Sequence, residues 1–564
     1  MSGYCSIRIF RILILLTSAA LPAAVVYASD TPHFTDEVEP QLLAVSLVDA
    51  MSDREALGQV LMYGYPGTSA DEVLLSWIGD EDLGSVKIFG WNAVNLPVLA
   101  EAIGNYQDVA LNSRLGIPLF IATDQEGGWV RHIKGDTSLT PGNMALGADK
   151  MPYDAWMTGL LLGRELSAVG VNMNFAPTVD LFVNPKADVI GPRAFMANPQ
   201  WTGILGLSFF KGMAEAGIIS SAKHFPGHGD TKVDSHGTLP VIHADMETLW
   251  NRDLVPYKTM IAGGVPAIMV GHLAFPSITG DVIPATLSHQ MITGILKEKM
   301  RFNGVVITDD LFMRGARTDG DTLPDICYRA LNAGADLLLV SRSHSNQRVI
   351  HQFLLAKMEE EEFNLRVRDA ARRVVTLKAS YLKRPDAVPF HPNPENIAVP
   401  TPGAEEFFLE QASRSITLID DERFPIPPAD AGRVLLAGYH EDFFREGLQR
   451  YPDARRWRLS YTSPKSTLKE KGRELLRAAQ DYDTVIVLLP NENTAELLDE
   501  LKPIADKLVV LSVLSPIHLE ALDWVKTSLA AYGTGPESFR AAFAALAGDF
   551  PPRGILPIPL KVSP

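Results

Sequence analysis

Eight short apolar runs, separated by amphipathic stretches, constrain the fold of the first part of this chain. Runs that are apolar throughout are typical of parallel strands buried on both faces of a sheet. Eight alternations of strand and helix over roughly 290 residues predict a (β/α)₈ barrel. No G-x-G-x-x-G motif follows any run, so a doubly wound dinucleotide-binding sheet gains no support. The runs are Gln59–Gly64, Ser85–Gly90, Ile117–Thr123, Gly170–Ala176, Ile218–Lys223, Pro266–Gly271, Gly304–Asp309 and Ala335–Ser341.

A smaller second domain is predicted beyond a proline-rich segment. Six prolines crowd between residues 385 and 402, a composition typical of a semi-rigid linker. Further apolar runs alternate with helical patterns after it, which predicts a second α/β unit with a mostly parallel sheet. We therefore predict a barrel domain over 29–384, a linker over 385–402 and a C-terminal domain over 403–564. The runs of the second domain are Arg433–Gly438, Trp457–Tyr461, Thr484–Leu489, Lys507–Val513 and Ser528–Tyr532.

The N-terminus has the pattern of a secretory signal peptide over residues 1–28. Arg8 and Arg11 precede an uncharged apolar stretch that runs to residue 28, and cleavage is expected before Ser29. A retained membrane anchor is the alternative, but Pro22 and the shortness of the stretch, against about 20 residues for a span, disfavour it. We expect a periplasmic or secreted protein with no stable membrane insertion after cleavage.

Composition excludes several classes of function. Apolar residues make up 46% of the chain and charged residues 21%, which is ordinary for a globular protein and excludes disorder or a coiled coil as the main architecture. The 51 basic and 67 acidic residues give a formal charge of −16. This charge argues against nucleic acid or an anionic membrane as a partner. Cys5 and Cys327 are the only cysteines, so a disulfide framework is excluded.

The segment from Lys223 to His236 is the richest in chemistry. It follows an apolar run and contains residues typical of a loop held in special conformations. A metal site is one interpretation, although Pro226 and Gly227 interrupt the helix that the histidine spacing would need. Acid–base catalysis is the other, with an aspartate that fixes the tautomer of a nearby imidazole. Taken without the rest of the segment, Asp234 and His236 could also be an ordinary hydrogen-bonded pair on the surface, which is a third interpretation. The residues that could bind a metal are His224, His228, Asp230, Asp234 and His236.

Two other segments place carboxylates where apolar runs end. Asp309 and Asp310 end one run. Because side chains alternate along a strand, at most one of the two faces the barrel axis as a nucleophile, and Asp310 is predicted to cap the next helix. Asp124 follows another run, where a carboxylate can bind two sugar hydroxyls while Trp129 offers an apolar face. A simple turn is the alternative for this second segment.

Together these segments resemble glycoside hydrolase family 3, and within it the β-N-acetylglucosaminidase branch. The resemblance covers the predicted barrel in order and implies a (β/α)₈ barrel followed by an α/β sandwich domain. The closing pattern of the second domain is similar in Ala531–Gly533 and Gly554–Pro557. The matching barrel segments are Asp124–Gly128, Asn174–Pro177 with Asp180, Gly191–Phe195, Lys223–Asp230, Asp234–His236 and Thr308–Leu311 with Met313.

The resemblance implies a role for each matching residue in a retaining, double-displacement reaction. Asp309 corresponds to the nucleophile that forms the glycosyl-enzyme. His236, oriented by Asp234, corresponds to the general acid and then the general base, in place of the second carboxylic acid of most glycosidases. Neither a metal nor another cofactor is implied. The residues implied to bind the terminal sugar are Asp124, Arg193, Lys223 and His224.

The sequence departs from the family's pattern at one sugar-binding position. The acidic segment is usually followed by an arginine four residues after its second glycine, and here that position holds His132. Arg131 stands just before it and is our candidate for the same sugar-binding role.

The Asp–His loop favours β-linked N-acetylglucosaminides over glucosides, because many β-glucosidases of the family place their acid/base residue elsewhere. With secretion, the expected substrates of an exo-acting enzyme are peptidoglycan fragments or chitin oligosaccharides, and the sequence does not choose between them. A β-glucosidase and a phosphorylase that uses phosphate in place of water are the alternatives within the family. A neutral histidine base repels phosphate less than a carboxylate does. A non-catalytic saccharide-binding protein and a metal-dependent hydrolase are the alternatives outside it, and the oligomeric state stays open.

Overall fold

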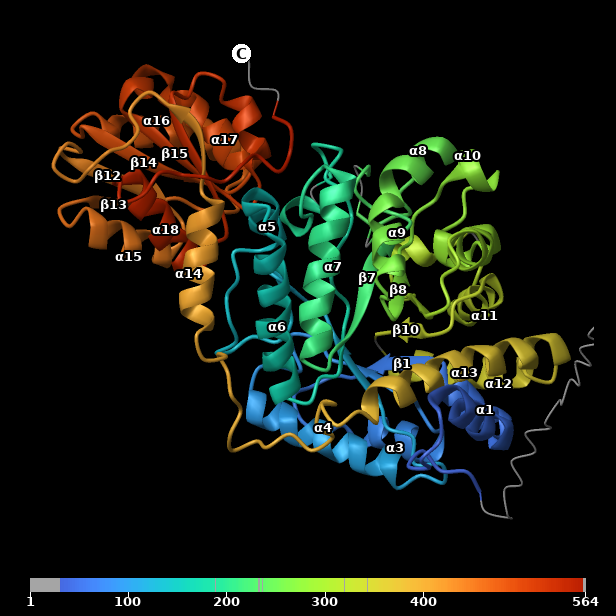
Figure 1. The fold of residues 1–564 in the computed structure, drawn as a ribbon. Coiled ribbons are helices and arrows are strands. Elements are labelled where there is room, and N and C mark those ends of the chain that lie inside the picture. The colour runs from blue at the N-terminus through green and yellow to red at the C-terminus, as the bar shows by residue number, and fades with distance from the viewer. Residues whose placement is uncertain are drawn as a thin grey trace, which may run out of the picture.

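The computed structural model describes residues 31–187, 189–231, 234–235, 237–318, 320–341 and 343–560. Within them the chain forms a barrel of parallel strands and a separate six-stranded sheet (Figure 1). The predicted signal peptide lies outside the described residues. Among the described residues, no helix is both long enough and apolar enough to cross a membrane.

The first sheet is a barrel whose eight strands all run parallel. Its order is β10-β1-β2-β3-β6-β7-β8-β9, and a parallel bridge between Ile307 and Leu337 joins the two outer strands. The predicted barrel is therefore confirmed, with every strand inside one of the eight apolar runs except β7, which extends two residues further. The strands are β1 (Leu61–Gly64), β2 (Ser85–Lys87), β3 (Phe120–Thr123), β6 (Met173–Asn174), β7 (Ile219–Phe225), β8 (Ala267–Val270), β9 (Val305–Thr308) and β10 (Leu338–Val340).

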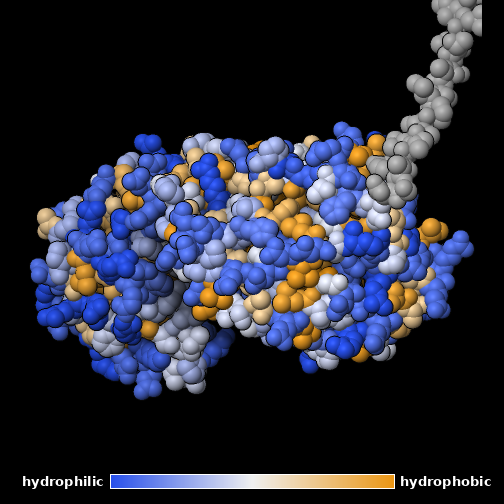
Figure 2. Space-filling view, turned by 90° about the horizontal axis from the view of Figure 1, so that it is seen from below, coloured by the Kyte–Doolittle hydropathy of each residue, from blue (hydrophilic) through white to orange (hydrophobic). Residues whose placement is uncertain are grey.

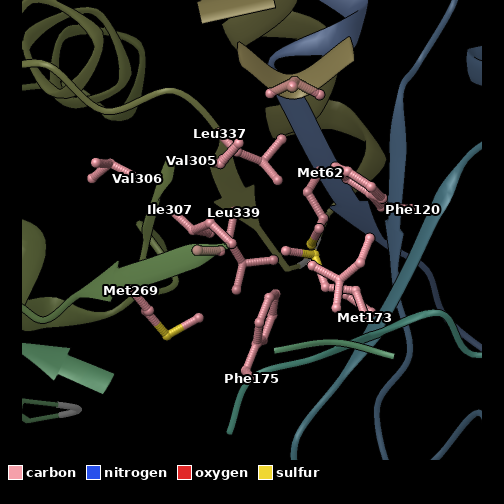
Figure 3. Close-up of a cluster of buried hydrophobic side chains, with 14 of the residues drawn as sticks. Met62, Phe120, Met173, Phe175, Met269, Val305, Val306, Ile307, Leu337 and Leu339 are labelled. Atoms are coloured by element: carbon pink, nitrogen blue, oxygen red, sulfur yellow. The ribbon is translucent and has the colours of Figure 1, made fainter. Parts of the chain in front are cut away.

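The barrel interior is filled with apolar side chains from strands on opposite sides (Figure 3). Phe120, Phe175 and Ile307 have no exposed surface, and Met173 and Met269 lie close beside them. Because every strand is buried on both faces, the sequence shows near-continuous apolar runs instead of alternation. This packed interior leaves the strand ends as the place for a site.

Helices surround the barrel and bury their apolar faces against it. Pro stands near the N-terminus of several of them, where its missing N–H has no helical partner to lose. The main helices are α1 (Pro40–Ala50), α2 (Asp53–Gln59), α3 (Glu72–Asp80), α4 (Leu96–Leu111), α5 (Asn143–Asp149), α6 (Pro152–Ala168), α7 (Pro199–Glu215), α9 (Val255–Ala262), α11 (Leu323–Ala333), α12 (His344–Lys357) and α13 (Glu361–Leu382). Shorter helical segments are α8 (Met246–Thr248), α10 (Pro276–Thr279), Gly191–Arg193, Leu249–Asp253, Ala285–Leu287, Gln290–Lys299 and Arg314–Ala316.

An extra hairpin follows β3 at the acidic segment. β4 (Gln125–Gly127) pairs antiparallel with β5 (Val130–Arg131). Gly127 and Gly128 turn the chain between them with positive φ angles of 85° and 60°. A Cβ on Gly127 would lie 2.7 Å from the Thr140 hydroxyl, so the close approach also requires glycine. The turn that the sequence suggested is present, but as the tip of a two-stranded ribbon.

The second sheet has the order β11-β16-β15-β14-β12-β13 and is parallel except for β11. Successive residues of β14 alternate between two apolar cores, with Ile486 and Leu488 on one face and Val485 and Val487 on the other. Helices cover both faces, so the α/β sandwich prediction is confirmed. The strands are β11 (Thr417–Asp421), β12 (Val434–Gly438), β13 (Arg455–Arg458), β14 (Thr484–Leu489), β15 (Leu508–Val513) and β16 (Thr527–Tyr532). The helices are α14 (Ala404–Ser415), α15 (Glu441–Arg450), α16 (Leu468–Ala479), α17 (Glu492–Leu498) and α18 (Pro536–Leu546), with shorter segments at Lys465–Thr467, Asp499–Lys507 and Pro516–Ala521.

Two details of the second sheet differ from prediction. β11 was not predicted, and β13 begins two residues before the apolar run proposed for it. Both are edge strands, hydrogen-bonded on one side only. Edge strands carry more polar residues than central ones, and the β13 sequence Arg455–Arg458 has three arginines, so its apolar signal is weak.

The two units contact each other through apolar and polar groups. Figure 2 shows them as two lobes with an indentation between them. α14 lies beside α5 (Figure 1), and Gln411 donates to Asp149 Oδ2 at 2.9 Å. The segment before α14 is held by Thr401, whose N–H donates to Glu165 Oε1 at 3.0 Å. Past α18, the N–H of Ile555 donates to the carbonyl of Ala148 at 2.9 Å.

Residues 383–403 form neither helix nor strand, in keeping with a connecting segment. The domain boundaries proposed above stay predictions.

Candidate active site

A cavity of about 620 Å³ lies at the carboxyl ends of the barrel strands. Polar side chains that follow different strands converge on it, as expected for a barrel whose chemistry sits at this face. Residues that line it include Lys87, Asp124, Glu126, His132, Arg193, Lys223, His224, His228, Ser235, Asp309, Asp310 and Arg314, together with Phe89, Trp91, Met269 and Phe312.

Five charged side chains form an ion network on one wall of this cavity. Lys223 Nζ lies 2.5 Å from Asp124 Oδ1 and 2.6 Å from Glu126 Oε1. Arg193 donates to both oxygens of Glu126, at 2.9 Å through Nε and 2.7 Å through Nη2. Lys87 pairs with the second oxygen of Asp124. The three cations and two carboxylates place fixed donors and acceptors within reach of a molecule with many hydroxyls.

The network holds its members in their charged forms. Burial opposes the ionisation of Asp124, but Lys223 and Lys87 outweigh it and hold the pKa of that carboxyl well below its usual value. Burial likewise opposes the ionisation of Glu126, yet Arg193 and Lys223 lower its pKa to about 2. For Lys87, burial outweighs the attraction of Asp124 and lowers the pKa to about 8. All these groups are predominantly ionised at neutral pH.

Local strand geometry explains how neighbouring residues reach the same cavity. Asp124 and Glu126 are two residues apart on the extended segment that enters β4, so both face the cavity. Gln125 points the other way, where it donates to the carbonyl of Ile133 at 3.0 Å. At the end of β7, the register against β8 shifts between Ala222 and Phe225, and such an irregularity re-aims side chains. Consecutive Lys223 and His224 both line the cavity as a result.

Asp309 lies directly after β9 on the cavity wall. Its Oδ1 accepts the N–H of Asp310 at 2.7 Å. Burial opposes its ionisation, but His272, His224 and this N–H outweigh burial and lower its pKa below the usual value. The group is therefore a carboxylate at neutral pH, as a nucleophile or an electrostatic stabiliser must be.

Asp310 has a different partner from the one predicted. Its Oδ1 accepts the N–H of Phe312 at 3.1 Å and the N–H of Ser341 at 3.1 Å. The predicted helix cap is wrong, because the chain continues from Asp310 into a turn and not directly into a helix. The carboxylate instead ties the end of β9 to the residue that follows β10.

His272, after β8, supports the chain beside Asp309. Its Nε2 lies 3.0 Å from the carbonyl oxygen of Asp310, and its Nδ1 lies 2.9 Å from the hydroxyl of Thr286. A carbonyl only accepts, so the proton is on Nε2, and Nδ1 accepts from the threonine. Burial lowers the pKa of His272 below its usual value.

Asp180 organises the loop that follows β7. It accepts from His224 Nδ1 at 2.7 Å and from the N–H of His228 at 2.7 Å. Arg193 Nη2 lies 3.3 Å from His224 Nε2 and can only donate, so this geometry places the His224 proton on Nδ1. Burial lowers the pKa of His228 to about 4. A buried carboxylate thus holds the start of this loop in place.

A match to a family model identifies the family of the chain. The model described as "Glycosyl hydrolase family 3 N terminal domain" matches residues 41–377, more than half of the sequence. The chain belongs to glycosyl hydrolase family 3. The matched region contains the whole barrel and the cavity at its strand ends.

Relatives within glycosyl hydrolase family 3 extend the comparison. A protein named beta-hexosaminidase A, from Pseudoalteromonas piscicida, is 36% identical over 302 residues, which cover 51% of this chain and 50% of that protein. The chain therefore spans about half the length of this relative. A beta-hexosaminidase from Idiomarina loihiensis is 37% identical over 257 residues, covering 45% of this chain and 74% of the relative.

Solved structures resemble both units together. A glycoside hydrolase family 3 beta-N-acetylglucosaminidase from Paenibacillus sp. is 28% identical, with a TM-score of 0.81 over 91% of this chain and 100% of that one. A beta-glucoside phosphorylase has a TM-score of 0.78 over 95% of this chain and 99% of that one. At 22% identity, the phosphorylase shows the shared fold alone.

The cavity brings together most of the site residues that the sequence suggested. Asp309, Asp124, Arg193, Lys223 and His224 all line it. They come from segments up to 185 residues apart, between Asp124 and Asp309, so the barrel itself assembles them.

His132, and not Arg131, borders this cavity in the part of the chain that the structure describes. His132 Nδ1 lies 3.7 Å from Asp124 Oδ2. Burial and the nearby Lys87 lower the pKa of His132 to about 4, so the ring is neutral at pH 7 and this contact is not an ion pair. Burial also lowers the pKa of Arg131. The sugar-binding role of Arg131 stays a prediction.

The acid–base loop is described in part. Ser235 is buried and lines the cavity, and its carbonyl accepts the N–H of Gly315 at 2.9 Å. Asp234 is exposed. His236 lies outside the described residues, so the predicted dyad stays a prediction.

Four residues of this site were not singled out as binding or catalytic from the sequence: Lys87, Glu126, Asp180 and His272. Two of them had a recognisable signal. Lys87 is a charge inside an apolar run, and such a lysine needs a buried partner. Glu126 stands two residues after Asp124, the spacing that puts two side chains on the same side of an extended chain. Asp180 and His272 follow strands without a motif that distinguishes a supporting role from a direct one.

Among the residues that the structure describes, no group of three or more histidine, cysteine or acidic side chains is placed to hold a metal ion. Of the histidines in the metal interpretation, His224 is bonded to Asp180 through its ring Nδ1. The His228 ring instead lies 2.9 Å from the Thr231 hydroxyl and 3.4 Å from the Ser235 hydroxyl.

Proposed function

We propose that this protein is an exo-acting, retaining glycoside hydrolase that removes a terminal β-linked N-acetylglucosamine from oligosaccharides. The observation that carries the proposal is the position of Asp309, an ionised carboxylate on the wall of a cavity rich in fixed donors and acceptors. The names of relatives support the same sugar, because the matched proteins above are a beta-hexosaminidase and a beta-N-acetylglucosaminidase.

Substrate binding is assigned to the ion network. The terminal sugar offers several hydroxyls, each both a donor and an acceptor. Asp124 and Glu126 accept from these hydroxyls, while Lys223 and Arg193 donate to them. Because the charges are held in place before the sugar arrives, binding requires little reordering of the protein. A cavity that holds one sugar deeply fits removal of units from a chain end.

The first chemical step is assigned to Asp309. Its carboxylate attacks the anomeric carbon, a new C–O bond forms, and the glycosidic C–O bond breaks. His236 donates its proton to the departing oxygen. In the second step His236 takes a proton from water, the water oxygen attacks the anomeric carbon, and the bond to Asp309 breaks. Asp234 has the role of orienting the imidazole.

The decisive experiment compares hydrolysis of a chromogenic β-N-acetylglucosaminide and the matching β-glucoside. Wild-type protein is expected to prefer the first substrate. Asp309→Ala is expected to lower kcat by a factor of at least about 10³, because it removes the nucleophile. Asp281→Ala changes an exposed aspartate of the barrel and is the matched control, with an expected rate close to wild type.

The outcomes separate the alternatives. An unchanged rate in Asp309→Ala contradicts the assigned nucleophile. A preference for the glucoside overturns the use of the Asp234–His236 pair as a sign of the sugar. A rate that depends on inorganic phosphate identifies a phosphorylase. Peptidoglycan and chitin fragments supplied in parallel then distinguish the two proposed sources of substrate, and detection of the protein in a periplasmic or extracellular fraction tests its expected location.

A further inference from the structure

Lys87 is a buried cation in the wall of the proposed catalytic cavity, and the reaction proposed above gives it no part. It ends β2, its side chain is 1% exposed, and it lines the cavity. Its ammonium lies 4.7 Å from the centroid of the Phe175 ring and 5.2 Å from that of Phe89. Among the described residues, its one ion pair is with Asp124 Oδ2. Because an isolated ammonium is costly to bury, this single carboxylate oxygen keeps the charge in the wall.

Asp124 is held by two lysines, one at each of its oxygens. Lys223 Nζ lies 2.5 Å from Oδ1, and Lys87 pairs with Oδ2. Each carboxylate oxygen has two acceptor sites, so each keeps one for a further donor. With a cation fixed at both oxygens, the carboxylate resists rotation, and its remaining acceptor sites keep the same directions. Two neighbouring hydroxyls of a sugar can then donate to it without reordering of the protein.

A second buried polar atom lies near Asp124 Oδ2. His132 Nδ1 is 3.7 Å from that oxygen, too far for a direct hydrogen bond, and has no hydrogen-bond partner among the described residues. A hydroxyl group between the two atoms can donate to the carboxylate and also bond with the ring nitrogen. Because burial lowers the pKa of His132 to about 4, its ring brings no charge at pH 7, and Lys87 is the cation that orients this oxygen.

We propose that Lys87 is a positioning residue for sugar binding, which holds Asp124 Oδ2 in the orientation that accepts a hydroxyl of the terminal sugar. This inference rests on the proposed function and adds to it a residue on which binding, and not the chemical step, depends. Without the charge of Lys87, Asp124 keeps only Lys223, at Oδ1, and Oδ2 loses its fixed direction. The sugar is then bound less well in the ground state and in the transition state alike, so KM rises while kcat changes little.

Lys87 differs from Lys223 in how firmly it keeps its proton. Burial opposes the charge of Lys223, but Asp124 and Glu126 outweigh burial and raise its pKa. Burial of Lys87 outweighs the attraction of Asp124, and its pKa is lowered to about 8. Lys87 therefore loses its charge as pH rises through 8, and sugar binding is expected to weaken over the same range. The charged or titratable groups that face Lys87 are Asp124, Lys223, Asp309 and His132.

The test measures how tightly the protein binds N-acetylglucosamine, the product of the proposed reaction, by calorimetry at pH 7 and at pH 9. In the wild type, the dissociation constant is expected to rise about tenfold at pH 9, because about one-tenth of Lys87 is still charged there. Lys87→Arg keeps its charge at both pH values, so its two dissociation constants are expected to be equal. Lys87→Met has no charge at either pH and is expected to bind weakly at both.

Lys378 provides the matched control. It is also fully buried, but it lies at the other end of the barrel, where it donates to Gln59 Oε1 and to the carbonyl of Gly84, each at 2.8 Å. These two acceptors precede β1 and β2, whereas Lys87 is the last residue of β2. Lys378→Met therefore removes a buried lysine away from the cavity, and its dissociation constants are expected to keep the difference of the wild type.

Hydrolysis of the chromogenic β-N-acetylglucosaminide at pH 7 separates binding from chemistry. Lys87→Met is expected to raise KM about tenfold with little change in kcat, and Lys87→Arg to restore part of the loss. A fall in kcat with an unchanged KM overturns the positioning role.

The remaining outcomes separate the role of Lys87 from the function on which it rests. Equal wild-type dissociation constants at pH 7 and pH 9 overturn the role, and so does a difference that persists in Lys87→Arg. Loss of the difference in Lys378→Met assigns it to the barrel as a whole and overturns the role as well. Failure of the wild-type protein to bind N-acetylglucosamine at either pH and to hydrolyse the chromogenic substrate refutes the proposed function itself.

Discussion

The barrel and the second domain use the same kind of buried parallel strand, yet their strand ends differ in chemistry. In the barrel, Asp124 and Asp309 directly follow β3 and β9, and Lys223 lies near the end of β7. The charges of all three meet in one cavity. In the second sheet, β14 and β15 run into Asn491 and Ser515, uncharged residues whose side chains cap the following helical segments. The carboxyl ends of parallel strands can form a binding site in both sheets. Whether such a site can catalyse a reaction depends on the side chains that follow the strands.

The largest expected effect on stability comes from breaking the barrel's ion network. Lys223→Met leaves the buried carboxylates Asp124 and Glu126 without their shared cation. Loss of one partner of a buried ion pair costs about 3–5 kcal/mol of unfolding free energy. Calorimetry of the variant beside Lys186→Met, a change at an exposed lysine, measures the difference. Equal stability of the two variants would mean that the network is solvated.

A smaller effect on the free energy of unfolding is expected at the contact between the two units. Burial raises the pKa of Asp149 to about 8, above about 3.9 in an unfolded chain. At this group the folded state binds more protons than the unfolded state, so the stability that Asp149 contributes is full below about pH 4 and is lost as pH rises through 8. Asp149→Asn removes this contribution and is expected to flatten the decline in unfolding free energy between pH 5 and 8.

Thermal unfolding across this pH range checks the sign, with Asp136→Asn, at an exposed position, as the control. A decline in the Asp149→Asn protein as steep as in the wild type would contradict a buried, protonated carboxyl at this contact.

The smallest effect is expected at the buried carboxylate of the second domain. Glu446 accepts from Arg445 Nε and Arg540 Nε, each at 3.1 Å, and both arginines are about half exposed. Arg540→Met leaves Arg445 in place, so the expected loss is below about 1 kcal/mol. A loss as large as that of Lys223→Met, measured in the same calorimeter, would remove the contrast between the two regions.

The barrel was predictable because its signal is repeated along the chain. Each buried strand is visible in the sequence as an apolar run. Few folds contain eight such strands in alternation with helices, and the (β/α)₈ barrel is the main one. The edge strand β11 was missed, because the sequence Thr417–Asp421 ends in two aspartates and lies beside the solvent. A sheet edge lacks the two-sided burial that makes a central strand visible in sequence.

The candidate site was predictable where residues form continuous motifs and not where they meet only in space. Asp124, Lys223 and Asp309 stand in recognisable segments. Lys87 belongs to the site because it pairs with Asp124, 37 residues away in the sequence. The two residues come together because β2 and β3 are neighbours in the barrel. Similarly, the position of His132, and not Arg131, at the cavity edge depends on the β4–β5 hairpin, which no local sequence pattern predicted.

The second domain is tied to the barrel where the chain enters it and again where the chain leaves it, through Thr401 on one side and Ile555 on the other. A body fastened at two separate points cannot swing freely about a single hinge. These contacts, together with the bond from Gln411 to Asp149, oppose rotation of the second domain about one hinge, so a change in the width of the gap has to break more than one contact.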